Sequence, residues 1–257
     1  AMSGDDQLFA DRAGALLTRV LAWPESVVHL RRVDSTQRLA RRFAELLAKD
    51  DEIPLPTLFT AFEQTAGRGR LGNRWTSPAG EGVYSTWLIE LPAMTAALPL
   101  RVGASLATAL SGISPRPVRM KWPNDLWVDG AKVGGVLIET FLGGQGKTLA
   151  AVGLGLNLGL TAAEAIELRA SSIYGLSWID ALSASSLAVQ AVAESTDAPD
   201  LRSIERLLIH RRGETLRFKT AGRRIEGSYE GLDEIGRLRV GVAGGIESFA
   251  SGEVIEA

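Results

Sequence analysis

Hydrophobic and polar residues alternate along this chain with two periods. Apolar residues at helical spacing predict amphipathic helices over residues 5–22, 37–47 behind a cap at 34–36, 98–110, 178–193 and 201–211. A period of two, or a short apolar run between turn residues, predicts strands over residues 27–33, 57–64, 84–91, 118–122, 132–141 and 148–158. Strands mixed with helices, several of them joined as hairpins, favour an α+β fold over a doubly wound sheet.

The pattern changes at Gly213. From there the chain consists of short alternating segments broken by glycines, at 215–220, 223–232, 238–242 and 246–251. Several short strands at close spacing indicate a small β barrel. We therefore predict two domains, an α+β domain over residues 1–212 and a small barrel over residues 213–257.

Composition narrows the classes of function. Among 257 residues, 28 are Lys or Arg and 30 are Asp or Glu, so the net charge of −2 gives no global attraction for nucleic acid. The chain has no cysteine, which excludes disulfides, thiolate metal sites and a cysteine nucleophile. No apolar run is long enough to cross a bilayer, and the start lacks a basic segment followed by an apolar one. We expect a cytoplasmic protein that has no membrane partner.

Residues 67–75 form a glycine- and arginine-rich segment, GRGRLGNRW. Its glycine spacing matches the dinucleotide-binding fingerprint, but the residues that follow cannot begin the long helix which that fingerprint requires. One remaining interpretation is a surface loop with solvated arginines. The other is a loop that folds over a ligand and brings Arg68 and Arg70 to phosphate or carboxylate oxygens. The segment alone does not decide between these two.

A second polar segment, KWPND, occupies residues 121–125. An Asx-type turn would explain Asn124 and Asp125, but it leaves Lys121 and Lys132 on otherwise apolar strands. Because a half-buried lysine needs an anionic partner, we predict a ligand carboxylate or phosphate near them. The two histidines lack metal-ligand spacing, and no residue is assigned to a metal.

Together these segments resemble biotin protein ligases, over roughly residues 28 to 257. Five segments match that family in order: 34–36 (DST), 62–70 (FEQTAGRGR), 121–125 (KWPND), 132–137 (KVGGVL) and 153–157 (GLGLN). The resemblance implies a biotin/lipoate ligase-like catalytic domain, with a mixed sheet and flanking helices, and a C-terminal SH3-like barrel. It implies an enzyme that makes biotinyl-5'-AMP from biotin and ATP with Mg²⁺. Biotin then passes to a lysine of a biotin carboxyl carrier domain.

The resemblance also implies how biotin is held. Ser35, Thr36 and Gln64 would hydrogen-bond the ureido end of biotin. Lys132 would reach its carboxylate, while Trp75 closes the apolar side of the pocket. The remaining biotin-binding positions are the two arginines of the loop and a set of glycines: Gly67, Arg68, Gly69, Arg70, Gly134, Gly135, Gly153 and Gly155.

On the nucleotide side, the resemblance implies that Lys121, Asn124 and Asp125 serve the phosphates and Mg²⁺, and that Asn157 serves the adenine. Arg68 and Arg70 would order the loop over the adenylate. The residues implied in catalysis are Arg70, Lys121, Asp125 and Lys132. Asp125 is the candidate for taking a proton from the carrier lysine.

The chain departs from the family pattern in two places. Gln37 replaces the usual Asn after Ser-Thr. The region before residue 28 is too short for a helix-turn-helix, so we expect no sequence-specific DNA binding. Instead, the first helix is expected to pack on the catalytic domain through Leu8, Leu16, Leu17 and Val20.

Two other functions are compatible with parts of this sequence. A lipoate or octanoyl ligase of the same fold is disfavoured because the Arg-Gly-Arg loop and KWPND point to biotin. A nucleic-acid-binding module built on Arg-Gly-Arg is disfavoured by the near-neutral charge and by the lack of aromatics interleaved with a basic patch.

Overall fold

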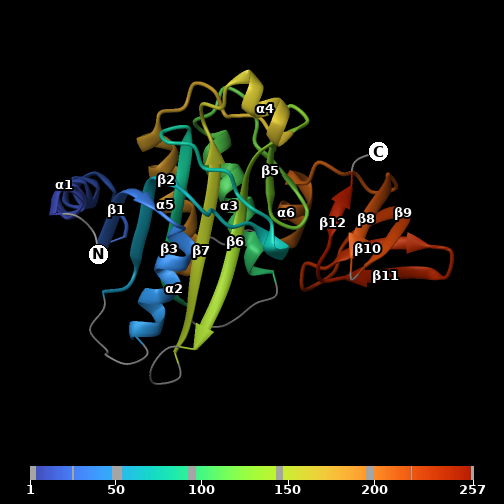
Figure 1. The fold of residues 1–257 in the computed structure, drawn as a ribbon. Helices are drawn as coiled ribbons and strands as arrows, with labels where there is room; N and C mark the ends of the chain where they lie inside the picture. The colour runs from blue at the N-terminus through green and yellow to red at the C-terminus, as the bar shows by residue number, and fades with distance from the viewer. Residues whose placement is uncertain are drawn as a thin grey trace.

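The structure is a computed structural model that describes residues 4–24, 26–47, 54–91, 97–142, 147–194, 200–220 and 222–255. Its larger sheet has seven strands in the order β1-β2-β3-β7-β6-β5-β4 (Figure 1). Strands β1 and β2 are parallel and every other neighbouring pair is antiparallel, so the sheet is mixed, as expected. The bounds are β1 Ser26–Val33, β2 Thr57–Gln64, β3 Gly82–Leu91, β4 Arg119–Lys121, β5 Asp125–Val128, β6 Ala131–Leu142 and β7 Thr148–Asn157.

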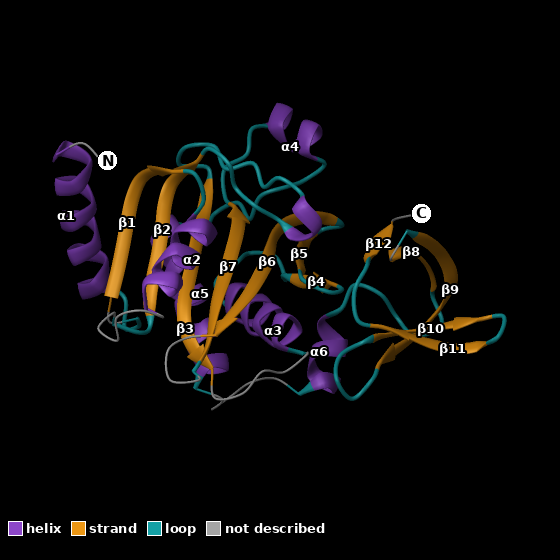
Figure 2. Ribbon diagram, turned by 60° about the horizontal axis from the view of Figure 1, so that its bottom comes forward, coloured by secondary structure: helices purple, strands orange, loops and turns teal. Residues whose placement is uncertain are grey.

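The structure describes six α-helices, some of which cover the two faces of this sheet while others lie at its edges. They are α1 (Gly4–Val20), α2 (Thr36–Leu47), α3 (Leu98–Ser111), α4 (Ala162–Leu168), α5 (Trp178–Ala193) and α6 (Leu201–Leu207). Because side chains on a strand alternate between faces, Leu88 of β3 packs in the cluster beneath α2, whereas Trp87 and Ile89 join the main core with α3 and α5. Figures 1 and 2 show α2 on one face of the sheet and α3 and α5 on the other.

Helix α1 lies beside the edge strand β1 (Figure 2). A Cβ atom at Gly14 would lie 2.5 Å from the Val27 carbonyl oxygen, so glycine permits the close approach. Leu17 is buried at 7% exposure, as expected, but Leu16 and Val20 are 62% and 54% exposed. The expected contacts of these two are wrong, because the helix turns them to solvent. The side chain of Leu8 lies outside the described residues.

The C-terminal part is a second, antiparallel sheet with the order β11-β10-β9-β8-β12. Its strands are β8 (Thr215–Thr220), β9 (Arg223–Leu232), β10 (Leu238–Val242), β11 (Gly245–Phe249) and β12 (Glu253–Ile255). The sheet joins the main core through residues such as Phe218 and Tyr229. Trp122, just after β4, donates from Nε1 to the Gly236 carbonyl oxygen at 3.2 Å and so ties the two sheets together.

The α+β class and a C-terminal antiparallel sheet of short strands are confirmed. Three short helices and strands were not predicted, namely α4, β5 and β12, and neither was the single 3₁₀ turn at Arg70–Gly72. Helix α6 ends at Leu207 instead of continuing to residue 211. Among the helices that the structure describes, none is long and apolar enough to cross a membrane. The division between residues 212 and 213 stays a prediction.

His29 of β1 is buried between α1 and α5. Its ring centroid lies 5.7 Å from that of Phe9 and 5.5 Å from that of Trp178. Its Nδ1 atom is buried and has no hydrogen-bond partner among the described residues. Burial lowers the pKa of His29 to about 4, because the charged imidazolium would lose its solvation there.

We expect His29 to make the protein less stable in mild acid. The unfolded chain takes up a proton near pH 6.5, whereas the folded chain takes it up only near pH 4. The free energy of unfolding should therefore fall as the pH drops through this window. His29→Phe should remove this part of the pH dependence in urea unfolding at several pH values. An NMR titration that placed the pKa of His29 above 6 would contradict the prediction.

Candidate active site

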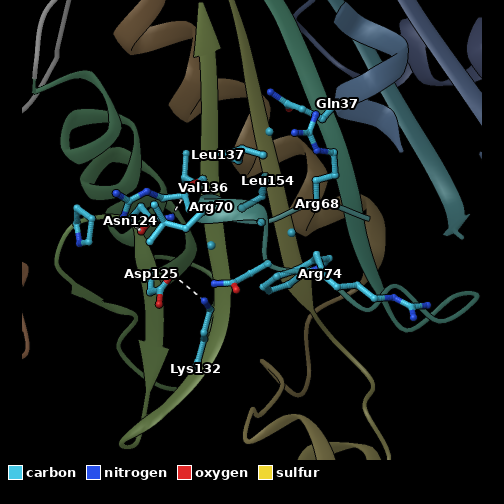
Figure 3. Close-up of a pocket in the computed structure, with 18 of the residues that line it drawn as sticks. Gln37, Arg68, Arg70, Arg74, Asn124, Asp125, Lys132, Val136, Leu137 and Leu154 are labelled. Atoms are coloured by element: carbon cyan, nitrogen blue, oxygen red, sulfur yellow. Dashed lines mark hydrogen bonds and ion pairs between the residues drawn. The ribbon is translucent and has the colours of Figure 1, made fainter. Parts of the chain in front are cut away.

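A cavity opens where several distant parts of the chain meet (Figure 3). Its wall includes the start of α2, residues 68–71 and 73–75, the turn at 122–125, and parts of β6 and β7. The C-terminal sheet adds residues 252–254 at β12. The cavity therefore lies between the two sheets, at a face of the larger one.

Two glycines of β7 let other segments reach its backbone. Leu154 turns into the main core, while its neighbours Gly153 and Gly155 face the other side. A Cβ atom at Gly155 would overlap the indole ring of Trp75, and one at Gly153 would overlap the side-chain oxygen of Gln37. Glycine at these two positions therefore lets Trp75 and Gln37 lie directly on the sheet.

A chain of polar groups lies at the start of α2. Gln64 Oε1 accepts from the backbone N–H of Thr36 at 2.9 Å and from its hydroxyl at 3.2 Å. The same amide donates from Nε2 to Ser77 Oγ at 2.8 Å, so both ends of Gln64 are fixed. Ser35 is only 1% exposed, and its Oγ has no partner among the described residues. A buried hydroxyl of this kind is suited to a ligand with hydrogen-bonding groups.

Residues 67–75 fold as a small hairpin. Gly69 donates its N–H to the Asn73 carbonyl oxygen at 2.8 Å, and Trp75 donates to that of Gly67 at 2.9 Å. A single 3₁₀ turn, Arg70–Gly72, forms the tip, where Leu71 has a φ of 56°. No long helix follows this segment, which agrees with rejecting the dinucleotide-binding fingerprint. We call residues 67–75 the arginine loop.

Arg70 reaches from the arginine loop to the turn after β4. Its Nη1 donates to Asn124 Oδ1 at 3.0 Å, and Asn124 Nδ2 donates to the Val136 carbonyl oxygen at 2.6 Å. Figure 3 shows Arg70 pointing toward Asn124, whereas Arg74 points away from the centre of the cavity. Burial lowers the pKa of Arg70, and the carboxylates of Asp125 and Glu253 act in the opposite direction. Arg70 is therefore a partly desolvated cation near the cavity wall.

Two lysines lie close to the same turn. Lys132 Nζ is 2.8 Å from Asp125 Oδ1 and 5.6 Å from the centre of the Trp75 ring (Figure 3). Lys121 is only 8% exposed, and its Nζ lies 4.5 Å from the centre of the Trp127 ring. Both positions stabilise an ammonium group, through a carboxylate in one case and an aromatic face in the other.

The cavity is positively charged although the whole chain is not. Among its described lining residues are five cations and two acids, which leaves a charge of +3 (5 − 2), whereas the chain carries −2. A concentration of cations in a cleft favours anionic ligands. The charged lining residues are Arg68, Arg70, Arg74, Lys121, Asp125, Lys132 and Glu253.

Most of the site residues predicted from the sequence line this cavity. They are Ser35, Thr36, Gln64, Arg68, Gly69, Arg70, Trp75, Lys121, Asn124, Asp125, Lys132, Gly135, Gly153 and Gly155. Three predicted residues are not among the lining residues. Gly67 lies against Trp75 within the loop, and Gly134 lies against the backbone of Gly155. Asn157 donates from Nδ2 to the Ser171 carbonyl oxygen at 3.1 Å.

Several lining residues were not predicted. Thr86 of β3 lies with its Oγ1 3.0 Å from Thr36 Oγ1 and 3.2 Å from Gln37 Oε1. Gln37 itself donates to the Ala151 carbonyl oxygen at 3.1 Å. The strand register could have indicated Thr86, since it faces α2. Nothing in the sequence pattern indicated Glu253, because its place depends on how the second sheet packs.

Comparison with known proteins identifies the family. The model of the biotin/lipoate A/B protein ligase family matches residues 29–157, which is half of the chain. The chain is 32% identical over 226 residues to a biotin–[acetyl-CoA-carboxylase] ligase of Paracoccus denitrificans. The matched region covers 81% of this chain and 91% of that protein. This chain belongs to that family.

Other relatives agree with this result. A bifunctional ligase/repressor BirA of Escherichia coli is 36% identical over 162 residues, which are 60% of this chain and 45% of that protein. The chain thus matches less than half the length of that relative. A biotin protein ligase from Aquifex aeolicus, solved in complex with biotin and ATP, superposes with a TM-score of 0.68 at 30% identity. The match covers 89% of this chain and 97% of that one.

Gly155→Ala should loosen the arginine loop. The added methyl group would overlap the Trp75 indole, so the ring has to move off β7. Crowding of this kind costs about 1–3 kcal/mol, and we expect the N–H groups of Gly69 and Trp75 to exchange with solvent at least about fivefold faster. Hydrogen exchange measured by NMR would test this. Gly244→Ala, where the new methyl group meets open space, is the matched control, and equal exchange in both variants would contradict the prediction.

Proposed function

We propose that this protein is an ATP-dependent biotin protein ligase. It would form biotinyl-5'-AMP from biotin and ATP and then transfer biotin to a lysine of a biotin carboxyl carrier domain. The observation that carries the proposal is one cavity that combines a polar recess at Ser35 with partly buried cations, in a chain of this ligase family. A ligand with hydrogen-bonding groups at one end and negative charge at the other fits this arrangement.

Biotin would lie between the start of α2 and Lys132. Ser35 Oγ would bond the ureido group, next to Thr36 and Gln64, whose positions are fixed by their mutual hydrogen bonds. Trp75 would cover the apolar middle of the ligand, because its ring lies on β7 beside Lys132. The biotin carboxylate would then contact the ammonium group of Lys132. Lys132 would be shared between biotin and Asp125, with which it forms an ion pair in this structure.

The phosphates of ATP would lie near Arg70, Asn124 and Lys121. Attack of the carboxylate on the α-phosphate brings two anions together, so nearby cations must offset their repulsion before the transition state can form. Arg70 is suited to this, because it is partly buried and held by Asn124. Asn157 does not line the cavity, and its assignment to the adenine stays a prediction.

Mg²⁺ fits this site when it is carried by the phosphates. The described residues contain no group of three or more acidic or histidine side chains that could hold a metal. Mg²⁺ is commonly held by one or two carboxylates together with substrate phosphates, and Asp125 and Glu253 both line the cavity. When bound, the ion would supply positive charge to the leaving pyrophosphate.

Asp125 would act in the transfer step. The carrier lysine must lose a proton before its amine attacks the acyl carbon of the mixed anhydride, a step that forms the amide and releases AMP. Asp125 lies in the cavity wall and forms an ion pair with Lys132. When Lys132 also contacts the ligand, the Asp125 carboxylate is less fully paired and can receive that proton. The arginine loop, which lies over this face of the sheet, would keep water away from the anhydride until then.

The proposal has three further parts. The catalytic domain would end near residue 212 and an SH3-like domain would follow, which the separate second sheet supports. The protein would act in the cytoplasm, where ATP and carboxylases meet in a reducing medium. Helix α1 would not serve as a DNA-reading helix, which is supported by its packing on β1 through Gly14.

Pyrophosphate release should depend on biotin and not on lipoate or octanoate. The polar recess at Ser35 suits a ureido group, whereas neither of the other two acids carries one at its far end. Incubation of the protein with ATP, Mg²⁺ and each acid, followed by a pyrophosphate assay, would test this. Equal turnover with lipoate would favour the lipoate ligase alternative.

Lys132→Ala should weaken biotin binding sharply. The carboxylate would lose a charge-assisted contact worth on the order of 1.5–3 kcal/mol, which corresponds to roughly 10- to 100-fold in affinity. Titration calorimetry would measure it. Lys147→Ala removes an equally charged group from an exposed ion pair with Glu90 and is the control. An unchanged affinity in Lys132→Ala would move the biotin carboxylate elsewhere.

A further inference from the structure

Glu139 lies on β6 just beyond the cavity. Gly135 and Leu137 line the cavity from the same strand, and every second residue of a strand faces the same side. Glu139 therefore follows them on that face, opposite Ala151 of β7. Its side chain is 24% exposed. Glu139 has no role in the proposed binding of biotin or of ATP.

The carboxylate of Glu139 is incompletely satisfied. Its Oε1 lies 3.7 Å from Arg68 Nη1, which is beyond hydrogen-bonding distance but close enough for an ion pair. Its Oε2 is buried and has no hydrogen-bond partner among the described residues. The amide of Gln37, on the same face, donates to the Ala151 carbonyl oxygen instead. A partly buried carboxylate with an unbonded oxygen costs free energy. An exception of this kind calls for an explanation, such as a role in function.

The guanidinium of Arg68 is suited to contact the Glu139 carboxylate and an anionic ligand at the same time. A guanidinium carries five N–H donors in a rigid planar fork, so one edge can bond a carboxylate while the other bonds a second anion. Arg68 also lines the cavity. It belongs to the arginine loop, which contacts the sheet where the Trp75 ring packs against Gly155. Arg70, by contrast, is held by the neutral amide of Asn124.

We propose that Glu139 is a positioning residue that holds Arg68 of the arginine loop against the sheet. One edge of the guanidinium stays on Glu139, and the other edge faces the anionic part of the bound ligand. This rests on the proposed function, since the ligand would be biotin and its adenylate. The loop is then ordered before the ligand arrives, which lowers the entropy that binding must remove.

A double-mutant cycle on the full chain tests the coupling without any ligand. Glu139→Gln keeps the shape of the side chain and removes its charge, and Arg68→Ala removes the partner. Each variant should speed hydrogen exchange at the Gly69 and Trp75 N–H groups by roughly fivefold, and the double variant should exchange no faster than Arg68→Ala alone. Glu139→Asp, which keeps the charge, should restore part of the protection. Glu90→Gln, in an exposed ion pair of the same sheet, should leave the loop unchanged.

Titration calorimetry with biotin supplies the second readout. Glu139→Gln should weaken biotin binding roughly fivefold, with no further loss when it is added to Arg68→Ala. Independent, additive effects on exchange, or loop protection unchanged in Glu139→Gln, would overturn the inference even if biotin binds normally. A parent protein that binds no biotin would overturn the proposed function, while the exchange cycle would still decide the role of Glu139.

Discussion

The close contact between Trp75 and the backbone of β7 at Gly155 organises the rest of the site. A side chain at position 155 would keep the indole off the sheet. With glycine there, the ring contacts β7 directly, and the hairpin bonds of the arginine loop hold Arg68 and Arg70 at the same cavity. The polar recess at α2 and the turn after β4 thereby become two ends of one cavity.

The second constraint is electrostatic. Five cations in one cavity repel one another, and burial of each is unfavourable without compensation. The structure compensates four of them separately, Arg70 by Asn124, Lys132 by Asp125, Lys121 by the face of Trp127, and Arg68 by Glu139, while Arg74 points away from the centre of the cavity. These contacts keep the cations apart and still leave donors for a ligand. Glu253, from the far end of the chain, adds negative charge near Arg70, so the second sheet contributes to the charge of the cavity.

Periodicity predicted most of the fold because the sheet buries one face or both faces of long strands. The bounds of β2 and of β8, β9 and β10 agree with the predicted segments. Short elements were not predicted, because few residues carry little periodicity. Strand β5 has four residues, and α4 has seven behind a capping box of Thr161 and Glu164. The motifs located the arginine loop and the turn at 122–125, and the alternation of β3 could have placed Thr86 on the face toward α2. The contacts of Gln37 and Glu253, however, depend on which strands pair and on packing between sheets. Local sequence carries little information about either.

The most direct test is a crystal structure of the protein with biotin and ATP. The account predicts the ureido group within hydrogen-bonding distance of Ser35 Oγ, the indole of Trp75 still on Gly155, and phosphate oxygens beside Arg70. Biotin bound outside this cavity, or bound within it with the arginine loop lifted from β7, would contradict the account.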